Sequence, residues 1–317
     1  MKIVILDGYT LNPGDLSWDE LKKIGNLVIY DRTLPDQVIE RAKGAEIILT
    51  NKAIVNRDSI QGLPELKYIG VMATGYNVVN IETAKQHKIL VTNAPSYSTA
   101  STAQHTFALI LELTNRVGLH AESVKDGEWL HSPDFCFRKS PLTELDGKTL
   151  GIIGFGRIGR QVAKIAQAFG LKIIAFHKHP ERDKMEGVKF TTIEEVFSQS
   201  DLISLHCPLT AENNEFVNNG LLSLMKPSAF LINTGRGQLI NEKDLATFLN
   251  NGKIAGAALD VVSSEPPSKD NPLLDAKNCI ITPHIAWSTK EARERLIQIV
   301  AENIKAYLSG KPQNVVV

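Results

Sequence analysis

Short apolar runs alternate with amphipathic stretches along almost the whole chain. Apolar runs without internal polar alternation are typical of strands buried on both faces of a parallel sheet, and the amphipathic stretches between them are typical of helices. The alternation therefore predicts βα units, and the expected fold class is α/β with two doubly wound parallel sheets.

The first part of the chain reads as one small α/β unit that ends near residue 93. Strands are predicted at residues 2–6, 27–30, 46–50, 68–72 and 89–91. Helices are predicted at residues 16–24, 36–43 and 81–85. A single long helix at residues 99–117 follows this unit.

A second α/β unit begins at residue 148, where the segment TLGIIGFG indicates a strand that runs into a turn. Further strands are predicted at residues 172–176, 202–206, 229–233, 255–260 and 279–282. Helices or helical turns are predicted at residues 157–169, 193–198, 221–225 and 242–250. The last helix, at residues 290–309, is long enough to return to the first unit.

The segment 118–145 between the two units shows little periodicity, and it contains Trp129, Phe135 and Phe137. We predict an irregular arm, and exposed aromatic surface of this kind needs a cover. A second copy of the chain is the natural cover, so the sequence predicts a homodimer.

Glycines at three fixed positions follow the strand that opens the second unit: Gly154, Gly156 and Gly159. The first permits a tight turn, the second lets the backbone approach a pyrophosphate, and the third lets helix and strand pack closely. The start of the helix directs free N–H groups toward the phosphates. The pattern predicts a dinucleotide site.

The next strand ends in His177 and Lys178, where an acidic residue normally accepts the adenosine ribose hydroxyls of NAD. Without that carboxylate a 2′-phosphate is not repelled, and Lys178 could neutralise it. An ordinary solvated loop with NAD held by other contacts is equally compatible with the sequence. We therefore expect NAD or NADP, with dual use or a mild preference for NADP. No metal is expected at His177 and His179, because no further ligands cluster nearby.

Three polar residues follow apolar strands of the second unit: Arg236, Glu265 and His284. The carboxyl ends of parallel strands line the ligand crevice, so the three are placed to converge. Arginine can grip a carboxylate bidentately, histidine can donate a proton near neutral pH, and a neighbouring carboxylate orients the imidazole. This set suits the reduction of a 2-oxo acid. Each residue alone also has an ordinary reading, as a surface arginine, a packing histidine or a solvated glutamate.

Composition excludes several other classes of protein. Lys+Arg and Asp+Glu are both 35, so no basic excess favours nucleic acid. No apolar stretch approaches the roughly 20 residues that span a bilayer. The three cysteines are widely spaced and resemble reduced thiols. We expect a cytoplasmic protein with no nucleic-acid or membrane partner.

At these residues the chain resembles the D-isomer-specific 2-hydroxyacid dehydrogenase family. The resemblance runs through nearly the whole length, and its most specific part is the ordered set of motifs. These are ATGYN (73–77), YSTASTAQ (97–104), GFGRIG (154–159), LHCPLT (205–210), NTGRG (233–237), LDVV (259–262) with Glu265-Pro266, and TPH (282–284). The segments TGYN (74–77) and HIAW (284–287) most resemble the glycerate dehydrogenase and hydroxypyruvate reductase branch.

The resemblance implies a Rossmann domain at residues 99–286, inserted into a flavodoxin-like substrate domain of residues 1–98 and 287–317. It implies that Arg236 holds the substrate carboxylate, with help from Thr74 and Gly75, that His284 is the acid/base and that Glu265 pairs with it. Trp287 would close the pocket or pack between the domains. The implied cofactor-binding set, beside the three glycines, His177 and Lys178, is Thr102, Arg157, Ile158, Cys207, Pro208, Thr234 and Asp260.

The expected function is hydride transfer between a nicotinamide cofactor and a small D-2-hydroxy acid, with D-glycerate and hydroxypyruvate first and glyoxylate second. Two alternatives remain at this point. One is a dehydrogenase of another 2-hydroxy acid such as D-lactate, which depends on pocket shape and not on motifs. The other is a dinucleotide-sensing co-repressor, which would carry a peptide-docking surface or long tails. The complete Arg, Glu and His set favours an enzyme.

Overall fold

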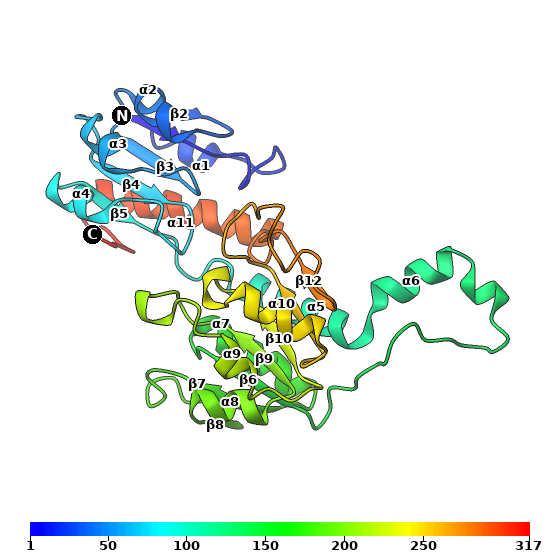
Figure 1. The fold of residues 1–317 in the computed structure, drawn as a ribbon. Coiled ribbons are helices and arrows are strands. Elements are labelled where there is room, and N and C mark those ends of the chain that lie inside the picture. The colour runs from blue at the N-terminus through cyan, green and yellow to red at the C-terminus, as the bar shows by residue number, and fades with distance from the viewer. The chain divides into compact units, whose positions relative to one another are not determined.

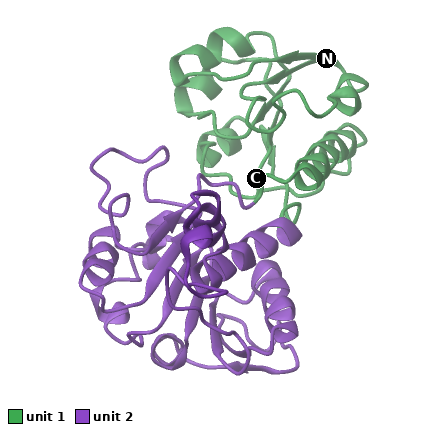
Figure 2. Cartoon of the chain, turned by 90° about the vertical axis from the view of Figure 1, so that its right-hand side faces the viewer, with its two compact units in different colours: residues 1–98, 287–317 green, residues 99–286 purple.

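The computed structural model describes all residues from 1 to 317, and the chain divides into two compact units. Residues 1–98 and 287–317 form unit 1, and residues 99–286 form unit 2 (Figure 2). Each unit contains one parallel sheet, with five strands in unit 1 and seven in unit 2. This confirms the predicted fold class.

Unit 1 has the strand order β2-β1-β3-β4-β5, with every pair parallel (Figure 1). This is the order of flavodoxin-like sheets. Its strands are β1 (Lys2–Ile5), β2 (Asn26–Ile29), β3 (Ile47–Thr50), β4 (Tyr68–Val71) and β5 (Leu90–Thr92). Its helices are α1 (Asp19–Lys22), η1 (Pro35–Gln37), α2 (Val38–Ala42), α3 (Arg57–Gln61), α4 (Ile81–Gln86) and α11 (Lys290–Leu308).

Successive residues of each unit 1 strand point to opposite faces and build two cores. Val4 and Ile48 pack with α2, α3 and α4 on one face, while Ile5 and Ile47 pack with α1 and α11 on the other. The sheet is therefore buried on both sides, as its nearly unbroken apolar strands require.

Unit 2 has the strand order β12-β11-β10-β9-β6-β7-β8, again entirely parallel. Counted from β6, this is the Rossmann order with one added strand. Its strands are β6 (Thr149–Ile153), β7 (Lys172–Phe176), β8 (Val188–Phe190), β9 (Leu202–Leu205), β10 (Phe230–Asn233), β11 (Gly256–Leu259) and β12 (Cys279–Ile281). Its helices are α5 (Thr99–Asn115), α6 (Val117–Lys125), η2 (Glu128–His131), α7 (Arg157–Ala168), α8 (Ile193–Gln199), η3 (Ala211–Asn213), α9 (Asn219–Leu222), η4 (Gly237–Leu239) and α10 (Glu242–Asn250).

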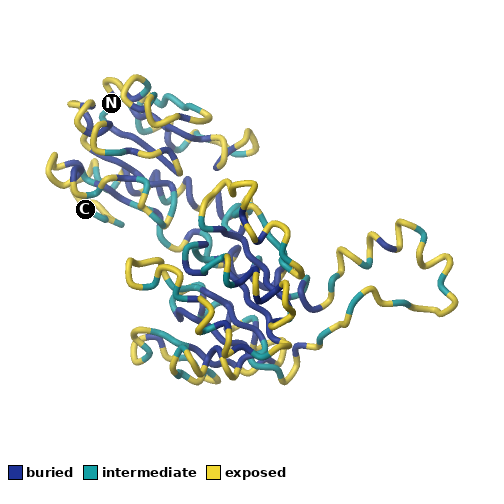
Figure 3. Tube along the Cα trace, viewed as in Figure 1, coloured by how far each residue is buried: buried dark blue, intermediate teal, exposed yellow.

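The unit 2 sheet also separates two cores. One packs α5 and α7 on the sheet, and the other packs α8, α9 and α10 on its opposite face. Figure 3 shows the strands of this sheet as buried chain, whereas the segment after α5 is mostly exposed. That segment, with α6 and η2, projects away from the sheet of its unit (Figure 1).

The structure corrects several predicted elements. The arm is not wholly irregular, because it contains α6 and η2. Helix α6 buries only Ser123, so its sequence has no apolar stripe from which the helix could be predicted. Helix α9 begins earlier than predicted because the side chain of Asn218 accepts a hydrogen bond from the Gly220 N–H. Sequence patterns did not predict α3 or the three-residue edge strand β8, which are too short to show a period.

None of the helices combines the length and the apolar character needed to cross a membrane.

Candidate active site

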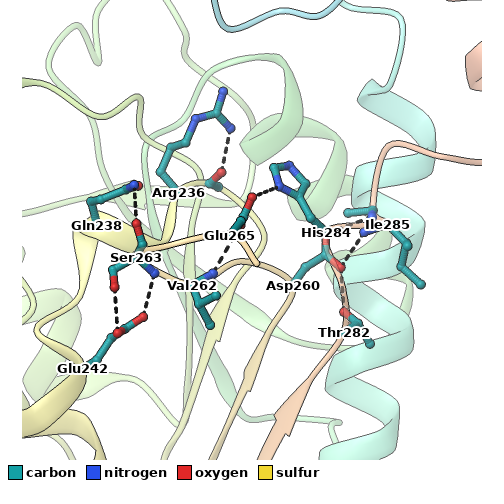
Figure 4. A network of polar contacts seen from close by, with 12 residues as sticks. Arg236, Gln238, Glu242, Asp260, Val262, Ser263, Glu265, Thr282, His284 and Ile285 are labelled. Atoms are coloured by element: carbon teal, nitrogen blue, oxygen red, sulfur yellow. Dashed lines mark hydrogen bonds and ion pairs between the residues drawn. The ribbon is translucent and has the colours of Figure 1, made fainter. Parts of the chain in front are cut away.

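Three adjacent strands deliver the predicted chemical groups to one edge of the unit 2 sheet. Arg236 follows β10, Glu265 follows β11 and His284 follows β12, and these strands are neighbours in the sheet. Because all three run parallel, their carboxyl ends meet at the same edge (Figure 4). The structure thus brings the predicted residues to one place.

His284 and Glu265 form a short hydrogen bond, 2.6 Å from Nδ1 to Oε2. The other carboxylate oxygen of Glu265 accepts the Val262 N–H at 3.3 Å. The carboxylate therefore places the proton on Nδ1 and leaves Nε2, which makes no hydrogen bond in this unit, for another molecule. The His284 side chain is 24% exposed, so it is neither buried nor fully solvated.

The backbone of His284 adopts φ = 54°, a left-handed conformation that is uncommon outside glycine. Its N–H donates to the carbonyl oxygens of Asp260 (2.8 Å) and Thr282 (2.9 Å). The Asp260 carboxylate accepts the next two amides, from Ile285 at 2.9 Å and Ala286 at 2.8 Å. Asp260 therefore holds the chain on both sides of His284 and maintains the strained conformation.

Asp260 is almost completely buried, and its carboxylate also accepts the Thr282 hydroxyl at 2.6 Å. Burial raises the pKa of this carboxyl, but the hydrogen bonds from His105, Thr282, Ala286 and Ile285 outweigh it, so the pKa lies below its ordinary value. The side chain is thus ionised and committed to the strand end. Its predicted contact with the cofactor stays a prediction.

His105, on α5, was not predicted from the sequence. Its Nε2 lies 3.0 Å from the Thr282 hydroxyl and 3.3 Å from the Asp260 carboxylate. A lone histidine within a helix gives no local signal of such a role, because its partners lie more than 150 positions away in the chain.

Arg236 lies in a rigid turn at the end of β10. The Asn233 amide donates to the carbonyl oxygen of Arg236 (2.8 Å) and accepts the Gly235 N–H (2.9 Å). The guanidinium donates to the Gly235 carbonyl at 2.8 Å and has no acidic partner in unit 2. A partly buried arginine without a carboxylate can bind an anionic ligand.

The fingerprint turn has the shape that a dinucleotide requires. Gly154 has φ = 94°, and a Cβ there would lie 2.4 Å from the Cys207 nitrogen. A Cβ on Gly159 would lie 2.3 Å from the Gly154 carbonyl oxygen, whereas one on Gly156 would meet nothing within 4 Å. The turn is therefore packed where helix meets strand and open where a pyrophosphate would approach. Arg157 and Ile158 form the first turn of α7, whose N–H groups face this opening.

The structure changes the interpretation of His177. Its Nδ1 accepts the Phe155 N–H of the fingerprint turn at 3.2 Å, and its Nε2 lies 2.8 Å from the Asp183 carboxylate. Both ring nitrogens therefore have partners within the unit. The predicted contact of His177 with the cofactor stays a prediction. Lys178, next to it, is exposed.

Asp183 supplies a carboxylate that the sequence did not reveal. It lies within 3.0 Å of Arg160 and 2.6 Å of Arg182, and its side chain is 6% exposed. Hydrogen bonds from Arg182 and His177 lower the pKa of this carboxyl to about 2. The carboxylate comes six residues after His177, beyond the strand end where an acidic residue is normally sought.

The other predicted cofactor residues lie in two places in unit 2. The Cys207 backbone packs against Gly154, with Pro208 next in the chain, and burial raises the pKa of the Cys207 thiol to about 11. Thr102 and Thr234 are both buried and both contact Thr106, which donates to the Thr102 carbonyl and lies 3.1 Å from the Thr234 hydroxyl. Their roles stay predictions.

In unit 1, the Thr74 loop follows β4 and is tied to the end of β5. The Thr74 hydroxyl donates to the Ala94 carbonyl (3.0 Å), and the Asn93 amide donates to the Thr74 carbonyl (2.7 Å). The N–H groups of Thr74 and Gly75 make no hydrogen bond within this unit. Trp287 packs edge-on to Tyr97 against the unit 1 core. Its role over the substrate stays a prediction.

Comparison with known proteins supplies the wider context. Residues 107–286 match the family described as "D-isomer specific 2-hydroxyacid dehydrogenase, NAD binding domain". The chain is 50% identical to hydroxypyruvate reductase from Blautia hydrogenotrophica, over 100% of this chain and 99% of that protein. It is 39% identical to glycerate dehydrogenase from Methylorubrum extorquens, over 99% and 98%.

A solved structure described as an acyclic imino acid reductase in complex with NADPH and D-Arg is 33% identical to this chain. The alignment covers 100% of both chains with a TM-score of 0.88. The resemblance noted in the motifs is confirmed: the chain belongs to the D-isomer-specific 2-hydroxyacid dehydrogenase family.

Proposed function

We propose that this enzyme reduces hydroxypyruvate to D-glycerate with a nicotinamide cofactor, and accepts glyoxylate as a second substrate. The observation that carries the proposal is the His284–Glu265 pair beside an arginine without an acidic partner, at the ends of three adjacent strands. The 50% identity over full length to a hydroxypyruvate reductase supports the choice of substrate.

In the proposed reaction Arg236 binds the substrate carboxylate. The nicotinamide supplies the hydride when it is bound. For this step His284 is protonated on both ring nitrogens. It donates the Nε2 proton to the oxygen that develops negative charge, while Glu265 keeps Nδ1–H in place. The ring is left neutral, and a proton from solvent restores the imidazolium before the next turnover.

A panel of 2-oxo acids tests this proposal. We expect the highest kcat/KM with hydroxypyruvate, a lower value with glyoxylate and the lowest with pyruvate. A preference for pyruvate would favour the D-lactate alternative. Binding of the cofactor without turnover of any 2-oxo acid would contradict the proposal and favour a sensing role.

We further propose that the enzyme uses both NADH and NADPH, with at most a mild preference for NADPH. Asp183 is only 6% exposed and forms ion pairs with Arg160 and Arg182 beside its contact with His177, so its charge repels a 2′-phosphate less than an exposed, unpaired carboxylate would. The exposed member of the group is Arg182, whose side chain is 65% exposed. Arg182 and Lys178 are exposed cations of this segment, and a cation there can bind a phosphate.

Replacement of Arg182 tests this cofactor proposal. Arg182→Ala is expected to lower kcat/KM for NADPH by roughly twofold to fivefold, as an exposed charge contact implies, and to leave NADH nearly unchanged. Lys184→Ala removes a charge from the same loop without touching Asp183, so it serves as the control. A wild-type preference for NADH of several hundredfold would overturn the proposal.

We also propose that the enzyme is a homodimer through its arm. Large apolar side chains are exposed along it, with Leu130 at 85% and Phe135 at 90%. Trp129 and Leu142 are each 52% exposed. Apolar surface of this extent on a projecting segment is typical of an oligomer interface.

Light scattering tests the assembly. At micromolar concentration we expect twice the 34.9 kDa mass of one chain. Leu130→Asp combined with Phe135→Asp should shift the mass toward one chain, because buried unpaired charges oppose association. The control is Leu34→Asp, which changes an exposed leucine outside the arm. A wild-type monomer would contradict the proposal.

Three unpaired cysteines are compatible with a reducing compartment, and we infer that the enzyme works in the cytoplasm.

A further inference from the structure

Glu242 begins α10, six residues after Arg236, and its side chain turns toward a different loop. The cap of this helix is Asn241, whose side chain accepts the Asp244 N–H. The Glu242 carboxylate is therefore not needed to cap the helix. One oxygen accepts the Ser263 N–H at 2.6 Å, and the other accepts the Ser263 hydroxyl at 2.7 Å (Figure 4).

The N–H, the hydroxyl and the carbonyl oxygen of Ser263 all make hydrogen bonds. Besides its two bonds to Glu242, its carbonyl oxygen accepts the Gln238 side-chain amide at 2.7 Å. The second Glu242 oxygen also accepts the Asn271 amide at 3.0 Å, which ties the far end of the same loop. The segment that follows Arg236 thus fixes the loop that carries Glu265.

The two loops also meet through their backbones. A Cβ on Gly237 would lie 1.9 Å from the Val262 carbonyl carbon, so no side chain fits between them. Val262 in turn donates its N–H to Glu265, whose other oxygen binds His284. A continuous set of contacts therefore runs from Glu242 through Ser263 and Val262 to the Glu265–His284 pair.

We propose that Glu242 is a positioning residue for catalysis: it holds the Val262–Glu265 turn so that the Glu265 carboxylate meets His284. The kinetic part of this inference rests on the proposed function. Glutamate suits this role because its two carboxylate oxygens accept hydrogen bonds from the backbone N–H and the hydroxyl of Ser263 at once. Hydrogen bonds to a neutral side chain would be weaker. A displacement of about 1 Å in a supporting group is enough to reduce turnover strongly.

Two measurements test the proposal. Hydrogen exchange of the backbone amides of residues 261–268 measures the stability of the turn directly and needs no substrate. Glu242→Ala should raise the exchange rate there, and Glu194→Ala should not. Glu194 is an exposed first-turn glutamate of α8 and so a matched control. In steady-state kinetics we expect Glu242→Ala to lower kcat by roughly tenfold, a part of the 10²–10⁴ that a general acid contributes, with cofactor KM unchanged within about twofold.

A double-mutant cycle separates positioning from general destabilisation. If Glu242 acts through Glu265, Glu242→Ala together with Glu265→Gln should be no slower than Glu265→Gln alone. Glu242→Gln keeps one acceptor for Ser263 and should retain most activity, and Ser263→Ala should show a smaller loss than Glu242→Ala. Unchanged exchange in Glu242→Ala, or losses that multiply in the double variant, would overturn the proposal. A wild type without turnover would overturn the proposed function, while exchange would still decide whether Glu242 holds the turn.

Discussion

His284→Ala is expected to lower kcat with hydroxypyruvate by a factor of about 10² or more, because it removes the group that donates the proton. Its Nε2 is the only ring nitrogen left for substrate, since Nδ1 is bound to Glu265 at 2.6 Å. The fingerprint turn that would bind the dinucleotide begins at β6 and makes no hydrogen bond to His284. Fluorescence titration should therefore give a nearly unchanged dissociation constant for the cofactor.

The control for this prediction is His87→Ala, which removes an exposed histidine at the end of α4. It should leave both kcat and cofactor binding at wild-type values. A large loss of kcat in His284→Ala would point to lost chemistry and not to lost packing. The side chain is 24% exposed, and its removal leaves the Asp260 contacts to the backbone in place. Near-normal turnover of His284→Ala would end the proposed role.

The fold class and the arrangement of the site could be predicted because the information is local. Apart from the edge strand β8, the strands of the two sheets follow short apolar runs, and parallel strands bring the residues that follow them to one edge. Arg236, Glu265 and His284 needed only this rule to be placed together.

The supporting contacts could not be predicted because their partners are distant in sequence or outside the expected spacing. His105 reaches Thr282 from α5, and Glu242 reaches Ser263 from the start of α10. The group around His177 shows the same limit. The sequence shows no carboxylate at the end of β7. In the structure, Asp183 from the following loop places one there, and the two ring nitrogens of His177 contact Phe155 and Asp183.

The backbone conformation of His284 could not be predicted from the sequence either. A Thr-Pro-His segment after a strand indicates a turn, but not that the histidine takes a left-handed φ held by Asp260 on both sides. The energy of such a conformation is supplied by the surrounding hydrogen bonds, several of which come from buried groups. Backbone strain of this kind is expected where a functional side chain must keep a fixed orientation.

Arg236→Lys should lower kcat/KM for hydroxypyruvate by roughly 10²-fold, even though the charge is kept, because a lysine cannot present two parallel N–H groups to a carboxylate. The guanidinium already uses one N–H on the Gly235 carbonyl at 2.8 Å, which fixes its plane and leaves the remaining donors for the ligand. A lysine ammonium in the same turn could satisfy that carbonyl or the substrate, but not both in this geometry. Arg236→Gln, which also loses the charge, should fall further.

The control is Arg57→Lys, at the exposed start of α3, which should leave the kinetics unchanged. Cofactor affinity separates the two ways in which Arg236→Lys could fail. If the arginine binds substrate alone, the dissociation constant for NADH or NADPH stays at its wild-type value while kcat/KM falls. A lysine that substitutes without loss would show that charge, and not the planar fork, is what this strand end contributes.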